Sequence, residues 1–216
     1  MARILLTAGP TRAYIDDVRY LTNASSGRMA KALASAALAR GHVVTVVSGP
    51  VSVRYPAGAR VIPVVTTAEM LEATLRELPG CDGVIAAAAP CDFQPEQRRA
   101  GKIPRQGTRL SLRLVPTPDV IATLARRERP GQWFVAFALE PGADPQRACA
   151  KITAKKCDLI VVNDVTALEA DTNAVTVYDA AHRQVGARRA SKRAVAGWLI
   201  RLIESRLIHA GPAGPA

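Results

Sequence analysis

The sequence predicts a doubly wound α/β fold, in which a mostly parallel, Rossmann-like sheet carries helices on both faces. Short runs of apolar and β-branched residues alternate with segments of helical spacing, and most runs are apolar throughout, as in strands buried on both sides. Only 4% of the residues are aromatic, which disfavours a β-sandwich built on Trp and Tyr. The 216 residues suit a single domain, expected at 1–208, followed by a flexible tail at 209–216.

The first half of the chain gives a regular alternation of strand and helix. We expect helices where apolar residues recur every three to four positions. Gly41 is expected to end the first helix, and Thr67 to cap the start of the second. The apolar runs between them are the strands. The expected order is strand 3–8, helix 28–40, strands 42–48 and 60–65, helix 68–78 and strand 82–88.

The second half continues the pattern and ends in an antiparallel addition. Residues 110–115 alternate like a strand, and Pro118 is expected to open a helix at its first position. Two β-branched runs near the end predict a hairpin that extends the sheet. The expected order is strand 110–115, helix 118–126, strand 132–138, helix 145–156, strand 158–162, hairpin 174–178 with 184–187, and helix 191–207.

The cysteine spacing and the hydropathy pattern indicate the redox environment and the cellular location of the protein. The four Cys occur in no CxxC or CxxxC spacing and only three His are present, so a zinc site is disfavoured and reduced thiols are expected. No apolar run approaches a membrane span, and the first apolar run stops at Gly9-Pro10, too early for a secretory signal. We expect a cytoplasmic protein with no membrane association.

The net charge of +11 admits nucleic acid, an acidic membrane surface or small polyanions as partners. Residues 97–113 carry six cations and no acid, with Gly and Pro that suggest a mobile loop. Residues 182–206 carry a similar excess in a helical pattern, typical of a solvated helix face. Aromatic residues hardly interleave with either cluster, which weakens a single-stranded nucleic-acid interpretation.

Ligands of doubly wound sheets bind at the carboxyl ends of the strands, so the residues there are the informative ones. The segment after the first strand, 9–27, is long for a connection and ends in Asn23-Ala-Ser25-Ser26-Gly27 before a helix. Ser hydroxyls and free amides at a helix start form an anion site, although an ordinary Ser cap is the alternative. Arg19 suits a phosphate or carboxylate, and Asn23 can donate to a developing oxyanion.

The fourth strand ends in Ala86-Ala87-Ala88-Ala89-Pro90-Cys91-Asp92, where small side chains let a ligand approach the backbone. Asp92 suits either a ligand contact or a turn cap, and Cys91 a packed thiol. Lys102, ten residues further on, lies in the acid-free loop. It suits either a phosphate contact made by a closing loop or a solvated surface residue.

Two further segments suit a triphosphate. Pro118-Asp119-Val120-Ile121 opens a helix directly after a strand, so its amides can cradle phosphate, or Asp119 can serve the helix dipole structurally. Lys151 and Lys155 share one helix face, as phosphate ligands or as solubilising charges. The chain lacks GxGxxG, GxxxxGK[ST] and GxSxG, which argues against a dinucleotide fingerprint, a Walker loop and a nucleophile elbow.

The motifs TAGPTRxxIDxVRYLTNxSSG, AAAxxDF, GKIPR, TPDVI, AFALE, KITAKKCDLIVVND and DTNAVTVYD together resemble phosphopantothenate–cysteine ligase, the ligase half of the bacterial bifunctional coenzyme A biosynthesis protein. The resemblance covers residues 3–206. It implies that a nucleoside triphosphate, CTP more than ATP, activates 4′-phosphopantothenate as an acyl-nucleotide, and that L-cysteine then displaces the nucleotide.

The resemblance also implies roles for individual residues. Asn23 would hold the carbonyl of the acyl intermediate, and Lys102, on a flap at about 93–109, would reach the reacting phosphate. The substrate would contact Arg19, Ser25, Ser26, Gly27 and Ala89. The nucleotide would contact Ala86, Ala87, Ala88, Asp92, Lys102, Pro118, Asp119, Val120, Ile121, Phe137, Lys151 and Lys155.

Cofactors and partners follow from the same resemblance. Mg²⁺ would arrive with the triphosphate and no dedicated metal site is expected. The family's FMN-dependent decarboxylase precedes the ligase and would be a separate partner here, so no FMN is expected. A homodimer paired through the hairpin at about 172–188 is implied. The chain departs from the family at Pro90-Cys91, at Thr117 and in Lys102-Ile-Pro-Arg105, which bears on the flap mechanics.

Two other functions compete with the ligase. A nucleotide-binding module without catalysis would fit the altered flap. A protein that binds DNA or RNA would fit the charge of +11, and it predicts binding to a random duplex with a steep salt dependence.

Overall fold

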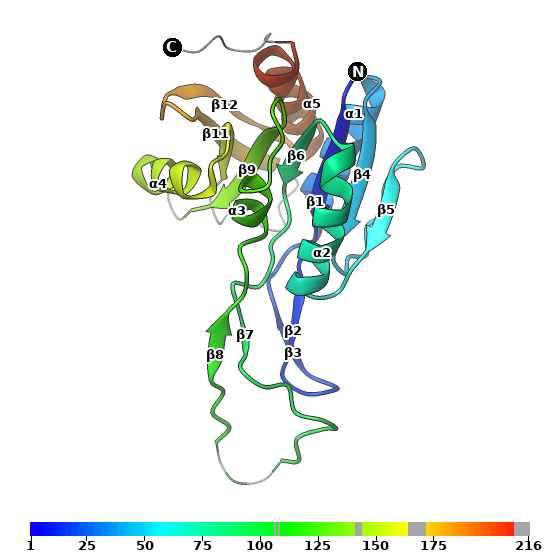
Figure 1. The fold of residues 1–216 in the computed structure, drawn as a ribbon, viewed down its shortest axis with the longest axis vertical. Coiled ribbons are helices and arrows are strands. Elements are labelled where there is room, and N and C mark those ends of the chain that lie inside the picture. The colour runs from blue at the N-terminus through cyan, green and yellow to red at the C-terminus, as the bar shows by residue number, and fades with distance from the viewer. Residues whose placement is uncertain (106, 108, 141–143, 164–171, 210–216) are drawn as a thin grey trace.

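The computed structural model describes residues 1–105, 107, 109–140, 144–163 and 172–209. The chain forms a body around an eight-stranded sheet and an arm that projects from one end of it (Figure 1). We define the arm as residues 12–22 and 93–116. The fold is the mostly parallel, doubly wound α/β architecture that the sequence predicts.

The sheet has the order β12-β11-β10-β9-β6-β1-β4-β5. Strands β10 to β5 in this order pair in parallel, and β11 and β12 add an antiparallel hairpin at one edge. The late hairpin is therefore confirmed. The strands are β1 (Arg3–Ala8), β4 (Val43–Ser48), β5 (Arg60–Pro63), β6 (Gly83–Ala86), β9 (Trp133–Leu139), β10 (Leu159–Asn163), β11 (Thr172–Asp179) and β12 (Gln184–Ser191).

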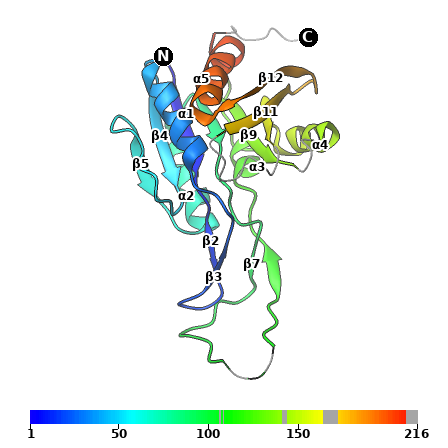
Figure 2. The same ribbon diagram turned by 180° about the vertical axis from the view of Figure 1, so that it is seen from behind.

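Alternate side chains of β1 enter two separate cores. Ile4 and Leu6 pack with α1 (Arg28–Ala39) and α5 (Lys192–Ile203), whereas Leu5 packs on the other face. That second core is covered by α2 (Thr67–Glu77), α3 (Val120–Ala125) and α4 (Pro145–Lys155). Figure 1 views the face that carries α2, α3 and α4, and Figure 2 views the face where α1 and α5 lie side by side.

The helix boundaries correct two expectations. The cap of α2 is Thr66, not Thr67, because Thr66 and Glu69 form a capping box. Thr67 is the first helical residue, and its hydroxyl bonds that of Thr11 at 2.8 Å. Helix α3 begins at Val120 with Asp119 as its cap, so Pro118 is not its first residue. Short helical turns η1 (Leu78–Gly80) and η4 (Glu204–Ile208) follow α2 and α5.

The arm contains two small antiparallel pairs that the sequence did not predict in this form. The strands β2 (Arg12–Tyr14) and β3 (Tyr20–Thr22) form a hairpin within the expected loop 9–27. The strand expected at 110–115 is confined to β8 (Leu114–Pro116), which pairs with β7 (Phe93–Pro95). Residues 110–113 alternate but are exposed and have no partner strand, so the pattern alone does not make them a strand.

No helix in the described part of the chain is both long and apolar enough to span a membrane.

Candidate functional site

A pocket of about 530 Å³ lies at the carboxyl ends of the central strands. It is lined by the last residues of β9 and β10 and by the residues that follow β1 and β6, together with the start of α1, the start of α3 and one face of α4. Nearly all the residues singled out from the sequence meet there: Asn23, Ser25, Ser26, Gly27, Ala86, Ala87, Ala88, Ala89, Asp92, Pro118, Asp119, Val120, Ile121, Phe137, Lys151 and Lys155.

The start of α1 forms one wall of the pocket. Its cap residue is Gly27, and no side chain caps the helix, so the interpretation of Ser25 or Ser26 as an ordinary cap is wrong. Gly27 has a φ of +72°, and a Cβ there would lie 2.9 Å from a methyl group of Val51. A glycine is therefore required for the chain to enter the helix at this angle. First-turn amides without a side-chain cap suit an anion.

Asn23 ties the start of α1 to the end of β6. Its Nδ2 donates to the carbonyl oxygens of Ala89 at 3.2 Å and Pro90 at 2.8 Å. These bonds hold the side-chain amide at the rim between the two walls of the pocket. A substrate carbonyl that accepts from Nδ2 would replace one of them.

The segment after β6 crosses the pocket with its backbone. The amide of Ala89 donates to the carbonyl of Gly9 at 2.9 Å, which draws this segment against the end of β1. Cys91 is buried, and its backbone amide donates to Thr11 Oγ1 at 2.8 Å. The prediction of a packed thiol at Cys91 is confirmed. Asp92 has an exposed side chain at the pocket wall, and its carbonyl accepts from the amide of Thr117 at 2.9 Å.

Asp119 links the start of α3 to α4. Its carboxylate accepts from the amide of Ala122 at 3.0 Å and from Lys155 Nζ at 2.5 Å. Burial raises the pKa of Asp119, but the hydrogen bonds from Lys155 and Ala122 outweigh burial and hold the pKa below its ordinary value. Asp119 is thus ionised and neutralises Lys155 in this state. Only part of the helix start remains open to a ligand.

Lys151 has a partner that sequence reasoning did not assign. Its ammonium contacts the carboxylate of Glu140, whose side chain is only 4% exposed. Glu140 closes the motif AFALE directly after β9, and an acid at the end of an apolar strand is the signal that could have identified it. The pocket also contains Asn163, Asn173 and Lys192, which were not among the predicted site residues.

The part of the pocket that the structure describes offers no metal cage of its own. Within the described ranges, no group of three or more His, Cys, Asp or Glu side chains could hold an ion. The carboxylates of Asp119, which lines the pocket, and of Glu140, which follows the lining residue Leu139, are engaged by Lys155 and Lys151.

Two predicted site residues lie outside the pocket. Arg19 lies in the arm, where its guanidinium is bound to the carboxylate of Asp16. Lys102 lies exposed on the flap, residues 93–109, and is not among the residues that line the pocket. The structure therefore brings together the residues on the body and leaves the two arm residues apart from them.

Only part of the second basic cluster is the solvated helix face that the sequence predicts, because Arg188 and Arg189 lie exposed on strand β12. Arg193 and Arg201 are exposed on α5, opposite Val195 and Leu199, which are buried. Arg183 binds the carboxylate of Asp179, and Lys192 lines the pocket.

Comparison with known proteins fits this arrangement. The family model described as "DNA/pantothenate metabolism flavoprotein C-terminal domain" matches residues 1–207. The chain belongs to this family. The match covers the body and the arm alike, so both are part of the family's domain.

Curated relatives are longer than this chain. A coenzyme A biosynthesis bifunctional protein, CoaBC, from Bacillus subtilis is 42% identical over 180 residues, which cover 81% of this chain and 44% of that protein. A cysteine/cysteine sulfinic acid decarboxylase from an unknown prokaryotic organism is 38% identical over 212 residues, which cover 96% of this chain and 59% of that protein. The chain thus spans about half the length of these relatives.

A solved structure matches along almost the whole chain. The crystal structure of the C-terminal domain of a CoaBC protein superposes with a TM-score of 0.82 at 32% identity, and the match covers 95% of each chain. The doubly wound sheet with its late hairpin is therefore the fold of this domain.

Proposed function

We propose that this chain is a phosphopantothenate–cysteine ligase of coenzyme A biosynthesis, which uses CTP in preference to ATP. The observation that carries the proposal is the pocket in which an α1 start without a side-chain cap, the Lys151–Lys155 face and the Asn23 amide converge. Family membership and the similarity to CoaBC proteins support it.

The proposed reaction has two steps. A carboxylate oxygen of 4′-phosphopantothenate attacks the α-phosphorus of the nucleotide, the bond to the β-phosphate oxygen breaks, and pyrophosphate leaves. The amine of L-cysteine then attacks the acyl carbon and loses a proton, and the nucleotide monophosphate leaves with its oxygen. Both substrates are polyanions, so cations and helix amides must offset their repulsion before the reacting atoms can meet.

The residues of the pocket suit these needs. The amides at Ser25–Gly27 would hold a phosphate, and the backbone at 86–89 with Asp92 would contact the base and ribose. Lys151 and Lys155 would bind the triphosphate once it replaces the carboxylates of Glu140 and Asp119. Asn23 would donate to the oxyanion that develops during amine attack.

Mg²⁺ is proposed to arrive with the triphosphate, because no cage of carboxylates is available for it within the described residues. Its contribution would be to neutralise phosphate charge. We assign no FMN to this chain. A decarboxylase is proposed as a separate partner. The proposed location is the cytoplasm.

The ligase is proposed to work as a homodimer. The hairpin β11–β12 ends the sheet in an exposed edge strand, which suits pairing with a second copy. The arm adds exposed apolar side chains at Phe93, Leu110 and Leu114, which are 54%, 50% and 43% exposed. Arg19 and Lys102 reach a pocket only if the arm moves or belongs to a second copy.

The experiment is a pyrophosphate-release assay on the full chain with 4′-phosphopantothenate, L-cysteine, Mg²⁺ and either CTP or ATP. Release that requires phosphopantothenate, and a product mass equal to 4′-phosphopantothenoylcysteine, is expected. Asn23→Asp should still release pyrophosphate but accumulate the acyl-nucleotide. Absence of release with both nucleotides rejects the ligase, and normal turnover by Asn23→Asp rejects the role of Asn23.

A further inference from the structure

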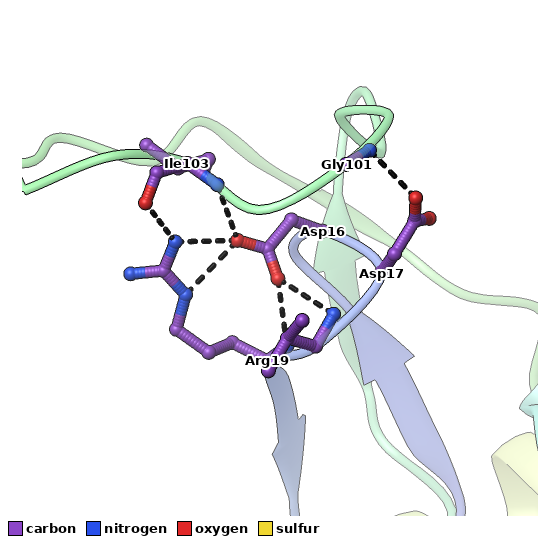
Figure 3. A network of polar contacts seen from close by, with 6 residues as sticks. Asp16, Asp17, Arg19, Gly101 and Ile103 are labelled. Carbon is purple, nitrogen blue, oxygen red and sulfur yellow. Dashed lines mark hydrogen bonds and ion pairs between the residues drawn. The ribbon is translucent and has the colours of Figure 1, made fainter.

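Asp16 lies in the arm, yet its side chain is completely shielded from solvent. Its Oδ1 accepts from the amides of Val18 at 2.9 Å and Arg19 at 2.7 Å. Its Oδ2 accepts from Arg19 Nε at 2.9 Å and Nη2 at 2.5 Å, and from the amide of Ile103 at 3.0 Å. One carboxylate oxygen therefore binds both the Arg19 guanidinium and the backbone of the flap (Figure 3).

Asp17 makes the matching contact on the other side of Lys102. Its Oδ2 accepts from the amide of Gly101 at 2.6 Å, and its Oδ1 accepts from Arg98 Nη2 at 2.9 Å. The amide of Asp17 donates in turn to the carbonyl of Gly101 at 3.1 Å. The amides immediately before and after Lys102 are thus held by two consecutive carboxylates (Figure 3).

Arg19 also contacts the flap directly. Its Nη2 donates to the carbonyl oxygen of Ile103 at 2.7 Å, so this guanidinium bridges the Asp16 carboxylate and the flap backbone. Hydrogen bonds with an ionised partner are shorter and stronger than neutral ones. Residues 97–113 carry six cations and no acid, and Asp16 and Asp17 bring two carboxylates against them from another segment.

We infer that Asp16 and Asp17 are positioning residues that join Arg19 and Lys102 into one unit, so that the two cations reach the pocket together. The inference rests on the proposed ligase function, in which Arg19 contacts the acid substrate and Lys102 the reacting phosphate. Arg19 and Lys102 come from segments far apart in the sequence, and both lie outside the pocket. A flap that moved without the β2–β3 hairpin would deliver only one of them.

Asp16 and Asp17 fix the backbone conformation of the flap in addition to offsetting its positive charge. Gly101 has a φ of +70°, a conformation that places its amide toward Asp17 and that other residues adopt with strain. Ile103 is held by its amide and its carbonyl at once. The backbone on both sides of Lys102 is thereby fixed relative to Arg19, while the Lys102 side chain stays exposed.

The first test measures the flap without any substrate. Trypsin should cleave slowly after Lys102 and Arg105 in the wild-type chain and about tenfold faster in Asp16→Asn and Asp17→Asn, because cleavage requires local opening of the held segment. Glu72→Gln, which breaks an exposed ion pair with Arg76 on α2, is the matched control and should leave the rate unchanged. Equal cleavage in the wild type and both aspartate variants would overturn the inference.

The second test asks whether Asp16 acts through Lys102. Asp16→Asn and Lys102→Gln should each lower kcat for pyrophosphate release, and the double variant should lie within about threefold of Lys102→Gln alone, since residues of one unit are not additive. Multiplicative losses would show that Asp16 acts elsewhere and would overturn the inference. If Asp16→Asn does not fold, Asp17→Asn replaces it, because the Asp17 side chain is 49% exposed.

The two proposals fail in different ways. A wild-type chain that releases no pyrophosphate refutes the ligase, while the trypsin rates still decide whether the pair holds the flap. A wild-type chain that turns over, with aspartate variants that match it in both tests, refutes the positioning role and leaves the ligase intact.

Discussion

The body and the arm of this molecule are held together by different forces. The body encloses two apolar cores on either side of one sheet, with Leu5 and Phe134 fully buried. The arm has short strands and exposed apolar side chains, and its segments are joined by carboxylates that bind guanidinium and amide groups. Burial holds the pocket in place, whereas hydrogen bonds and ion pairs to Asp16 and Asp17 hold the segments of the arm together.

The same substitution in the two regions gives the largest expected contrast. Phe134→Ala should lower the free energy of unfolding by about 3–5 kcal/mol, because it removes a fully buried ring and leaves a cavity. Phe93→Ala, at a side chain that is 54% exposed, should change it by less than about 0.5 kcal/mol. Urea unfolding followed by circular dichroism measures both. Similar losses at the two positions would show that the arm shares the cooperative core.

The reverse contrast is expected for activity. Lys102→Gln should lower the rate of pyrophosphate release by about a hundredfold, in the range seen when one transition-state donor is removed. Its unfolding midpoint should match that of the wild type, because the side chain is exposed on the arm. A fully active variant would reject the role assigned to the flap.

The sequence predicted the body well because its strands are buried on both faces and read as continuous apolar runs. It failed in the arm, where Arg12–Tyr14 and Tyr20–Thr22 are too short and polar to show a strand pattern. It also exchanged Thr66 for Thr67 as the cap of α2, since adjacent threonines give the same local signal.

The site was predictable where the strand ends converge, and not where it depends on partners distant in sequence. Residues 86–92 and the Lys151–Lys155 face were found from their position after strands or on one helix face. An acid at the end of an apolar strand is a signal for Glu140, but neither its pairing with Lys151 nor the contact of Arg19 with Ile103 could be foreseen. The contact of Arg19 with Ile103 joins the hairpin to the flap across 84 residues, which no local pattern encodes, whereas Arg19 and Asp16 pair within one turn.

A smaller effect is expected where charge also stabilises the body. Glu204 accepts from Arg40 and lies 3.0 Å from Nε2 of His42, which is buried. Glu204→Gln should lower the free energy of unfolding by about 2 kcal/mol, since hydrogen bonds to a charged group are lost. Glu72→Gln, at an exposed pair, should cost less than about 0.5 kcal/mol. Thermal unfolding at neutral pH compares the two, and equal shifts would show that burial of Glu204 is irrelevant.

The smallest effect is the pH dependence of that contact. Burial raises the pKa of Glu204, but hydrogen bonds from Arg40 and His42 outweigh it and hold the pKa below its ordinary value. The carboxylate therefore stabilises the fold above about pH 4, the ordinary range of Glu, and this contribution is lost as the pH falls further. The difference in melting temperature between the wild type and Glu204→Gln should shrink below that pH. A constant difference down to acid pH would contradict the assignment.

The Asp16 contacts in the arm should persist to a lower pH than the Glu204 contacts in the body. The hydrogen bond from Arg19, with amides of Val18 and Ile103, holds the pKa of Asp16 far below its usual range. The stabilisation that Asp16 gives is present above the ordinary pKa of Asp and is lost only as the pH falls through that lowered value. Trypsin-independent probes of the flap, such as hydrogen exchange at the Ile103 amide, should show protection that persists through mildly acid pH.

The order of the sheet has a consequence for how the chain folds. Strand β1 comes before the other strands in the sequence but lies inside the sheet, between β4 and β6. Arg3 must therefore pair with Val43, and Ile4 with Gly83. Each such pairing joins residues far apart in the sequence, so the entropy of closing a long loop is lost before the contacts form. Contacts of this kind raise the contact order and slow folding. The β2–β3 hairpin is local and can form early. Refolding should therefore order this hairpin before the central sheet, and the pocket, which needs the ends of four strands, is completed last.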